Sequence, residues 1–417
     1  MTKTTSLLSK ALKRFGVSQY CLTISMFFLP LSLQMNNIFL VLFLIAFIFE
    51  WNIREKISSL SSNYKKALPI VLLFFSIVFS YSYSFYTQTA LDQILKSIPL
   101  LLVPLVFISD PKMFVENRNK FLYGLVAGCL VAAITSWGWL AYQLWLEEDI
   151  SKAITWKYSK GNLISKLDQH TPYLAMFLFT SVGFIVSRLE LIKRKKIKRI
   201  LNIIVIIQIL FLLHLLSRTA ILYFFVAAII FLLIKRKIFV LVALLLVSFT
   251  FFNLLVHDSN DNRGFFERLL YKEMGLSGTD GLDPRFERWQ YSWDLFKKSP
   301  IIGVGAGDVD VMRVIAYREA GDLEAYKLKY NAHNQFFEFL SAQGIIGGIL
   351  FIFCFGYIIY LAFSTKEYFL FYTVVGIFIC SSTESMFRRS WGVVFFSIIA
   401  SLVIVSYLRN KNNSLEF

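Results

Sequence analysis

One histidine and five arginines are the residues best suited to chemistry in this chain. The five are Arg218, Arg285, Arg288, Arg388 and Arg389. His333 stands in "KYNAHNQFFEF" beside Asn334, directly before a long apolar run. Histidine can act as a general base because its ordinary pKa is about 6.5, and arginine binds phosphate oxygens with a planar fork of donors. These residue types suit a reaction on a phosphorylated substrate.

The chain around these residues has the composition of a membrane protein. Of its 417 residues 57% are hydrophobic, and 43 are phenylalanine, whereas soluble domains average about 45–50% apolar. The clearest long apolar runs are 121–144, 201–216, 220–234, 239–255 and 393–407. The net charge of +16 does not indicate nucleic-acid binding, because the lysines and arginines fall in short connections between apolar runs. An all-α polytopic membrane protein is predicted.

The apolar runs predict about twelve transmembrane helices. Their approximate ranges are 20–33, 36–51, 68–83, 97–109, 121–144, 171–188, 199–216, 218–234, 237–256, 344–363, 367–382 and 391–408. With the basic N-terminus in the cytoplasm, the loops alternate between basic and mixed or acidic, as the positive-inside rule requires. Both termini are therefore predicted to be cytoplasmic. The first span, which no cleavage site follows, is predicted to be a retained anchor.

One loop on the outer side is far longer than the others and divides the chain into three. We predict an N-terminal membrane bundle over residues 1–256, a helical outer loop over 257–343, and C-terminal spans with a short tail over 344–417. Within the loop, "RFERWQYSWDLFKKSP" has apolar residues at helical spacing and predicts an amphipathic helix. "VMRVIAYREAGDLEAYKLKY" predicts another. Loops of this length are functional or disordered, and the aromatic content favours a functional one.

The predicted topology places all of these polar residues on the outer face. His170, which opens a span in "DQHTPYLAMF", is there as well and is a candidate substrate contact. Basic residues are what the positive-inside bias removes from this face, so their presence requires a reason. Arginines at the outer lipid boundary suit a phosphorylated lipid or a lipid pyrophosphate.

Structural interpretations of the same residues stay open at this point. Arg218, in "LLSRTA", is also placed to snorkel to lipid headgroups. Arg388 and Arg389, in "TESMFRRSW" after Glu384, are also placed to anchor the end of a span. His333 also fits a loop histidine that bonds to nearby backbone.

Other patterns carry less weight. "GVGAG" follows a predicted helix and a proline, not a strand, so a dinucleotide site is not predicted. Asp308 and Asp310 form a D-x-D pair of the kind that holds a metal in nucleotide-sugar enzymes, but such substrates are not normally present on the outer face. His214 either faces Arg218 one turn away or packs within its span. The four cysteines lie in apolar runs without paired spacing and are predicted to be core residues.

Three stretches of the chain resemble the bacterial O-antigen ligase and O-antigen polymerase superfamily. They are "LLSRTA", "DPRFERWQYSWDLFKKSPIIGVGAG" and "AHNQFFEFLSAQGIIGGILF". In that family a span ends in Ser-Arg, and the large periplasmic loop has an Arg four residues before a Trp, then Pro-x-x-Gly-x-Gly. The loop closes with His-Asn before a span that carries a Gly-x-x-Gly pair. The corresponding residues here are Ser217-Arg218, Arg285 with Trp289, Pro300 to Gly305, His333-Asn334, and Gly344 with Gly347.

The resemblance implies a fold of the membrane glycosyltransferase C type in the bacterial inner membrane, with a periplasmic active site. Such enzymes move a glycan from undecaprenyl pyrophosphate to a lipid A–core acceptor or to another lipid-linked glycan, without metal, nucleotide or other cofactor. Arg218 and Arg285 would hold the pyrophosphate, with Arg288 in reserve for the second position. His333 would activate or orient the acceptor hydroxyl, and inversion at the sugar is expected. The residues expected to bind substrate are Arg288, Asn334, Arg388, Arg389 and His170.

Two alternatives to a ligase remain. An O-antigen polymerase, which joins lipid-linked repeats, shares the same motifs; the set of Ser-Arg, Arg-Trp and His-Asn favours the ligase. A transporter of lipid-linked glycans belongs to a different class. Transporters usually carry polar residues and broken helices at the membrane centre, whereas here the polar set lies at one face.

Overall fold

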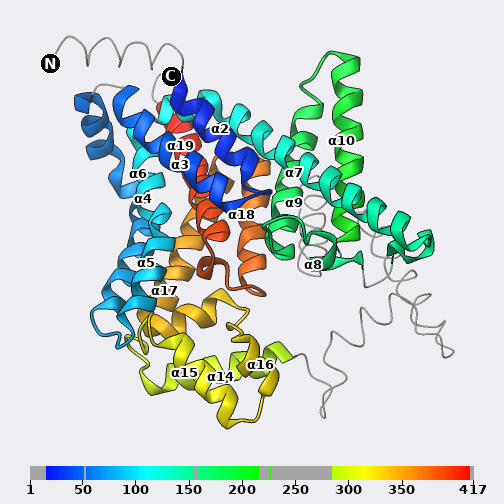
Figure 1. Cartoon of the computed structure of the whole chain (residues 1–417). Helices are drawn as coiled ribbons and strands as arrows, with labels where there is room; N and C mark the ends of the chain where they lie inside the picture. The colour runs from blue at the N-terminus through cyan, green and yellow to red at the C-terminus, as the bar shows by residue number, and fades with distance from the viewer. Residues whose placement is uncertain (1–15, 51–52, 155–157, 216–225, 227–283, 414–417) are drawn as a thin grey trace, which may run out of the picture.

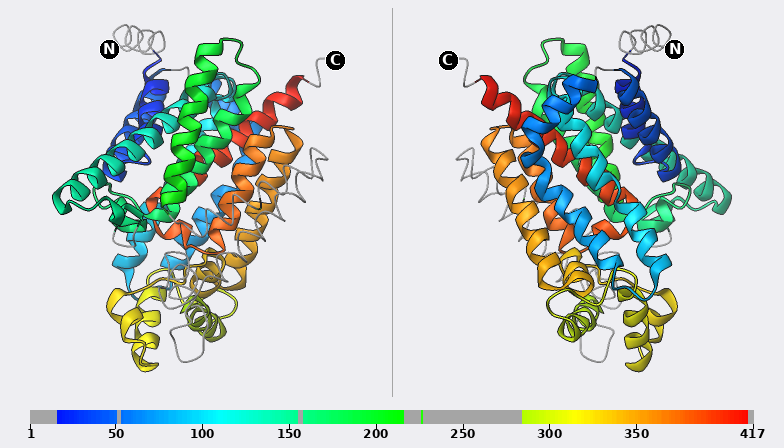
Figure 2. Two further views of the ribbon diagram at one scale, coloured as in Figure 1. Left: turned by 90° about the vertical axis from the view of Figure 1, so that its right-hand side faces the viewer. Right: turned by 90° about the vertical axis from the view of Figure 1, so that its left-hand side faces the viewer.

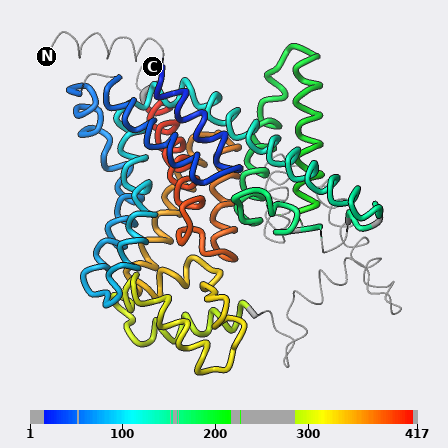
Figure 3. Tube along the Cα trace, viewed as in Figure 1, coloured from blue at the N-terminus to red at the C-terminus, as the bar shows by residue number. Residues whose placement is uncertain are grey.

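The computed structural model describes residues 16–50, 53–154, 158–215, 226 and 284–413, and all regular structure in these ranges is helical. The first part forms α2 (Val17–Phe28), α3 (Leu33–Glu50), α4 (Ile53–Tyr81), α5 (Thr87–Ser97), α6 (Pro99–Ser109) and α7 (Pro111–Glu147). Next come η1 (Ile150–Ile154), α8 (Lys160–Leu163), α9 (Thr171–Leu189) and α10 (Lys195–His214). The later part forms α14 (Pro284–Lys298), α15 (Val309–Glu319), α16 (Leu323–Leu328), α17 (Gln335–Ser364), α18 (Tyr368–Ser381), η3 (Met386–Arg388) and α19 (Ser390–Asn413). Figure 3 follows the path of the chain.

Eight helices of the described chain are long and apolar enough to cross a membrane, with α5 and α6 together forming one of them. The shorter apolar helices α2 and α18 add two. Every predicted span that falls on described residues coincides with one of these elements. The spans predicted at 218–234 and 237–256 lie outside the described residues, apart from residue 226. The prediction of a polytopic helical membrane protein is therefore confirmed.

α19 is the most enclosed of these candidate spans. Inside the structure, 94% of its apolar window is buried, and it contacts α6, α7, α17 and α18 in the middle of the bundle (Figure 1). The ring of Phe396 lies 4.8 Å from that of Phe355 on α17 and 5.0 Å from that of Phe387. A helix that is apolar on all sides is typical of such a buried position.

The helices of the predicted outer loop lie at one end of the bundle. In both side views α14, α15 and α16 lie at the bottom, and the start of α2, the turn between α9 and α10 and the end of α19 lie at the top (Figure 2). The amphipathic helix predicted from "RFERWQYSWDLFKKSP" is α14, and its Trp289 stacks on Phe337 of α17 at 5.7 Å. The second predicted loop helix is in fact two, because Gly321, with a φ of 76°, follows the end of α15.

α17 is interrupted at Gly344, where φ is 65° and ψ is −160°. The segment from Pro300 to Gly305 packs into this interruption and completes hydrogen bonds that the helix loses. Val304 N donates to Ser341 O at 2.9 Å, and Ile345 N donates to Pro300 O at 2.8 Å. Irregular backbone at the edge of a membrane span is tolerated where other parts of the protein satisfy it in this way.

Two glycines make the close approach possible. A Cβ on Gly344 would lie 2.3 Å from Ile301 O, and a Cβ on Gly303, where φ is 74°, would lie 2.3 Å from Ala342 C. Both residues have the left-handed backbone that favours glycine. Gly303 and Gly344 therefore form a backbone junction that holds the segment between α14 and α15 against α17.

Candidate active site

His333, Arg285 and Glu384 meet, although they come from three separate parts of the chain. Arg285 opens α14, His333 lies directly before α17, and Glu384 lies in the connection between α18 and α19. His333 Nδ1 lies 3.2 Å from Glu384 Oε2, and Arg285 Nη2 lies 3.4 Å from Glu384 Oε1. One carboxylate therefore joins two of the three residues that the sequence predicts to be catalytic.

Glu384 is buried, with 7% of its side chain exposed, yet it favours the ionised state. Burial by itself raises the pKa of this carboxyl. The hydrogen bond and charge of His333, together with the charges of Arg285 and His170, outweigh burial and hold the pKa below the ordinary value of 4.5. At neutral pH a fixed negative charge therefore faces both His333 and Arg285.

This charge decides which ring nitrogen of His333 is basic. An ionised carboxylate accepts a hydrogen bond, so the tautomer with the proton on Nδ1 is favoured. Nε2 then carries the lone pair, and within the part of the chain that the structure describes it has no hydrogen-bond partner. In a carboxylate–imidazole pair of this kind the carboxylate orients the ring and stabilises the protonated histidine.

The backbone around His333 is fixed by two asparagines. His333 has a φ of 48°, and its N–H donates to Asn331 Oδ1 at 2.9 Å. Asn334 is the N-cap of α17: its Oδ1 accepts from Phe336 N at 2.9 Å, and its Nδ2 donates to Ser382 O at 3.0 Å. The predicted contact of Asn334 with substrate remains a prediction, and its observed contacts hold the loop.

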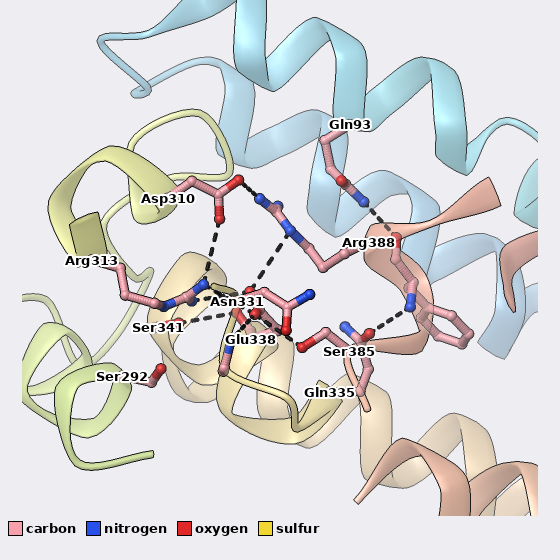
Figure 4. Close-up of polar contacts among 12 residues, drawn as sticks. Gln93, Ser292, Asp310, Arg313, Asn331, Gln335, Glu338, Ser341, Ser385 and Arg388 are labelled. Atoms are coloured by element: carbon pink, nitrogen blue, oxygen red, sulfur yellow. Dashed lines mark hydrogen bonds and ion pairs between the residues drawn. The ribbon is translucent and has the colours of Figure 1, made fainter. Parts of the chain in front are cut away.

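Next to this loop, Glu338 of α17 has charged and polar partners from three other segments: α15, the loop before α17, and the connection that carries η3 (Figure 4). Arg313 of α15 binds both of its oxygens, each at 3.1 Å, and the two side chains are 1% and 2% exposed. Ala332 N, next to His333, donates to Glu338 at 2.8 Å, and Ser385 Oγ, next to Glu384, donates at 3.1 Å. Glu338 thus links the neighbours of His333 and Glu384, which we call the candidate pair.

Arg388 completes this charged group. Its Nη2 forms an ion pair with Asp310, and its Nε lies 3.8 Å from Glu338 Oε2. Asp310 also lies 3.4 Å from Arg313. The two arginines and the two carboxylates balance one another (Figure 4). The buried charges are therefore paired, as their burial requires.

The connection that carries Glu384 is held on two further sides. Gln335 Oε1 accepts from Phe387 N at 2.5 Å, and Gln93 of α5 donates to Phe387 O at 2.7 Å. These contacts fix the short helix η3 against α5 and α17 (Figure 4). The positions of Glu384, Arg388 and Arg389 are thereby set by helices far apart in the sequence.

Arg288, one turn after Arg285, lies against the same loop. The carbon of its guanidinium stands 3.9 Å from the centre of the Tyr330 ring, and that ring lies edge-on to His333 at 5.8 Å. A guanidinium over an aromatic face is a favourable cation–π contact. Arg288 therefore lies near His333, with the Tyr330 ring in contact with both side chains.

Three more predicted residues are accounted for as follows. His170 is the N-cap residue of α9; its pKa is lowered by burial and by the charges of Arg389 and His333, against the opposing charge of Glu384. Its Nδ1 is buried without a hydrogen-bond partner among the described residues. His170 and Arg389 therefore lie near the candidate pair. Arg218 lies outside the described residues, and its role remains a prediction.

Next to these residues is a cavity of about 650 Å³. Its wall includes Tyr330, Asn331, Arg388 and Arg389. Arg389 is exposed. The cavity is large enough for a charged headgroup and adjoins the loop that carries His333.

The patterns given less weight in the sequence have structural roles. Asp308 accepts from Phe85 N at 2.9 Å and Tyr86 N at 2.8 Å, so it holds the turn between α4 and α5. His214 Nδ1 accepts from Trp137 Nε1 at 3.2 Å, and its Nε2 lies 3.1 Å from Ala153 O. His214 is thus a packed span histidine. Cys129, Cys354 and Cys380 are buried, and all four cysteines are free.

Sequence reasoning noted Glu384 without giving it a role, and it missed Arg313 and Glu338. A signal for each was present. Arg313 interrupts the apolar positions of "VMRVIAY", and Glu338 follows the cap of α17 by four residues in an otherwise uncharged helix. Charged residues in such settings are rarely buried unless paired.

A comparison of the sequence with models of known protein families gives the same family as the sequence motifs. Residues 203–352 match the family model described as O-Antigen ligase. This range includes Arg218, Arg285, Arg288 and His333. No curated protein matches the chain. The match indicates a glycosyltransferase-like enzyme that acts on lipid-linked glycans. Residues 203–352 thus carry a domain described as O-Antigen ligase, and over these residues the resemblance predicted from the motifs is confirmed.

Proposed function

We propose that this protein is an O-antigen ligase. It transfers a glycan from undecaprenyl pyrophosphate to a hydroxyl of a lipid A–core acceptor, on the periplasmic face of the inner membrane. The observation that carries the proposal is the Glu384 carboxylate, which contacts His333 Nδ1 and Arg285 Nη2 in a chain with the O-antigen ligase domain. Glu384 thereby holds both His333, the base for the acceptor hydroxyl, and Arg285, the cation for the leaving group.

The reaction needs both of these groups at the same moment. His333 Nε2 takes the proton of the acceptor hydroxyl while the acceptor oxygen forms a bond to the anomeric carbon of the donor sugar. The bond between that carbon and the pyrophosphate oxygen breaks, and the electron pair leaves with the pyrophosphate. A direct attack of this kind inverts the anomeric centre.

Arg285, together with Arg218, stabilises the charge that develops on the leaving pyrophosphate. Guanidinium groups that are fixed before the reaction do this without reorganisation. Glu384 keeps Arg285 in place and keeps the lone pair of His333 on Nε2. Once His333 is protonated, its charge is stabilised by the same carboxylate until the proton is released.

Deletion of the gene, followed by electrophoresis of the lipopolysaccharide, tests the proposal. A ligase mutant should show bare lipid A–core while undecaprenyl-linked glycan accumulates, and a plasmid copy should restore the ladder. Core capped with a single repeat would instead identify a polymerase. An unchanged ladder would contradict both activities.

A further inference from the structure

The cavity of about 650 Å³ beside the candidate pair adjoins a second, largely apolar cavity. The second cavity measures about 270 Å³ and shares Lys96 and Ser390 with the first. Apart from Asn37 and these two residues, the described residues of its lining are apolar: Leu40, Val41, Leu44, Leu95, Ile98, Pro99, Leu102, Val103 and Val394. We call it the apolar groove, and the larger one the basic cavity.

Both cavities are lined by α3, by the stretch from α5 to α6, and by the start of α19. Along each of these segments the lining passes from the basic cavity to the apolar groove. On α3, Leu33 lines the basic cavity, and Val41 and Leu44 line the apolar groove. From α5 to α6 the lining passes from Gln93 through Lys96 to Leu102. From Leu33 to Leu44 a helix advances by about 16 Å. The two spaces together therefore suit a ligand with a polar head and a hydrocarbon chain.

The charge of the basic cavity points to an anionic head. Among the residues that the structure describes, Asp310 is the one acidic residue in its lining, and Asp310 is paired with Arg388 and Arg313. Lys96, Lys329 and Arg389 then leave an excess of positive charge in the lining. Lys96 is close enough to Arg388 and Arg389 for their charges to act on it, and Asp92, outside the lining, partly offsets them. Like charges held together in this way favour a bound anion.

The basic cavity also borders the candidate pair. Tyr330 and Asn331 belong to its wall, and they contact the ring and the backbone N–H of His333. The charges of Arg389 and Glu384 both act on the pKa of His170, so these three residues lie near one another. In a sugar linked to a polyprenyl pyrophosphate, only the pyrophosphate separates the reacting carbon from the hydrocarbon. A site for the lipid end must therefore adjoin the catalytic residues, and this one does.

We propose that Lys96 and Arg389 bind the lipid-side phosphate of the donor, and that the apolar groove between α3, α5, α6 and α19 takes the first part of its hydrocarbon chain. This inference rests on the proposed function, because it assigns the basic cavity to the donor. It adds Lys96 and the apolar groove to the residues that recognise the donor, and it leaves Arg285 at the sugar side of the pyrophosphate.

Binding of farnesyl diphosphate to the purified full-length protein in neutral detergent tests the site. Inorganic pyrophosphate supplies the head alone, and farnesol supplies the chain alone. The wild type should bind farnesyl diphosphate at least about tenfold more tightly than either, because chain and head are both bound. Equal binding of farnesyl diphosphate and inorganic pyrophosphate would exclude the apolar groove.

Two variants separate the head from the chain. Lys96→Ala combined with Arg389→Ala should weaken binding of both diphosphates by about tenfold or more, since each lost contact is charge-assisted. Val41→Trp, at a half-exposed lining position, should remove the advantage of farnesyl diphosphate and leave inorganic pyrophosphate unchanged. The matched controls are Lys327→Ala on α16 and Ile45→Trp, one turn further along α3, and both should bind as the wild type does.

The outcome also separates this site from the proposed function. Wild-type affinity for farnesyl diphosphate in both lining variants would overturn the site, and the lipopolysaccharide ladder would still report on the ligase activity. Weakened binding that the controls do not show, with the ladder lost in the same variants, would support both.

Discussion

The Nδ1 atom of His333 lies 3.2 Å from the Oε2 atom of Glu384, across 51 residues of sequence. The histidine lies directly before α17, and the glutamate lies in the connection between α18 and α19. Because Glu384 also contacts Arg285, the relationship couples the residue proposed to activate the acceptor with one proposed to stabilise the leaving group.

Glu384→Gln should lower the rate of glycan transfer by about 100-fold or more, the usual contribution of a well-placed general base. The amide keeps the shape of the side chain but removes the charge that orients His333 and holds Arg285. The measurement is initial transfer rate with purified protein and lipid-linked donor. Glu319→Gln, at an exposed position on α15, is the control. Equal rates for the two variants would mean that Glu384 has no part in catalysis.

The stability of the protein should depend on the ionisation of Glu384 at acid pH. Its pKa in the folded protein is below the ordinary 4.5, so its stabilising effect is complete above that value and is lost as pH falls through the lowered pKa. Thermal unfolding of wild type and Glu384→Gln, followed from about pH 7 down to about pH 3, should give midpoints that converge at the acid end. A difference between the two thermal midpoints that stays constant across this pH range would contradict a lowered pKa of Glu384.

Arg313→Met should destabilise the fold by about 3–5 kcal/mol, because it leaves Glu338 buried without its bidentate partner. The loss can be measured as a lower denaturant or thermal midpoint. Arg318→Met, on the same helix but exposed, is the control and should be close to neutral. Replacing Arg313 and Glu338 together with methionine should recover part of the stability. A double variant no more stable than Arg313→Met would show that the ion pair is not the source of the loss.

The double variant should still transfer glycan poorly. Glu338 accepts a hydrogen bond from Ala332 N, beside His333, and from Ser385, beside Glu384. Recovered stability without recovered activity would separate the positioning role of Glu338 from its structural role. Full recovery of both would contradict that positioning role.

Gly344→Ala should destabilise the protein by about 2 kcal/mol or more, because alanine resists the left-handed backbone and its Cβ would meet Ile301 O. Gly356, on the same helix, has nothing within 4 Å of an added Cβ. Gly356→Ala should therefore be neutral or slightly stabilising. The thermal midpoints of the two variants make the comparison. Equal midpoints would mean that the junction at Gly344 is unimportant for stability.

Much of the fold follows from the sequence because apolar length and helical spacing are local signals. The spans that fall on described residues and the helix α14 were predicted from such patterns, and so was the placing of His333 and Arg285 at one end of the bundle. The interruption at Gly344 was not predicted, because it depends on the backbone of Pro300–Gly305 packing against it. The glycines of "GVGAG" do not by themselves show which part of the chain they pack against.

The candidate site was predictable only in part, for the same reason. His333 and Arg285 stand in family motifs, whereas the contact of each with Glu384 depends on how α14, α17 and α18 pack. Arg313 and Glu338 lie 25 residues apart, and nothing in the spacing of two charges within apolar helices specifies that they pair. Long-range ion pairs of this kind follow from the packing of the helices that carry them.

The central claim is that His333 activates the acceptor hydroxyl. The most direct measurement is the initial rate of glycan transfer by purified His333→Ala, with the thermal midpoint and the binding of farnesyl diphosphate recorded on the same sample. We predict a rate at least about 100-fold below that of the wild type, with a folded protein that still binds the diphosphate. Transfer at the wild-type rate by His333→Ala would contradict it.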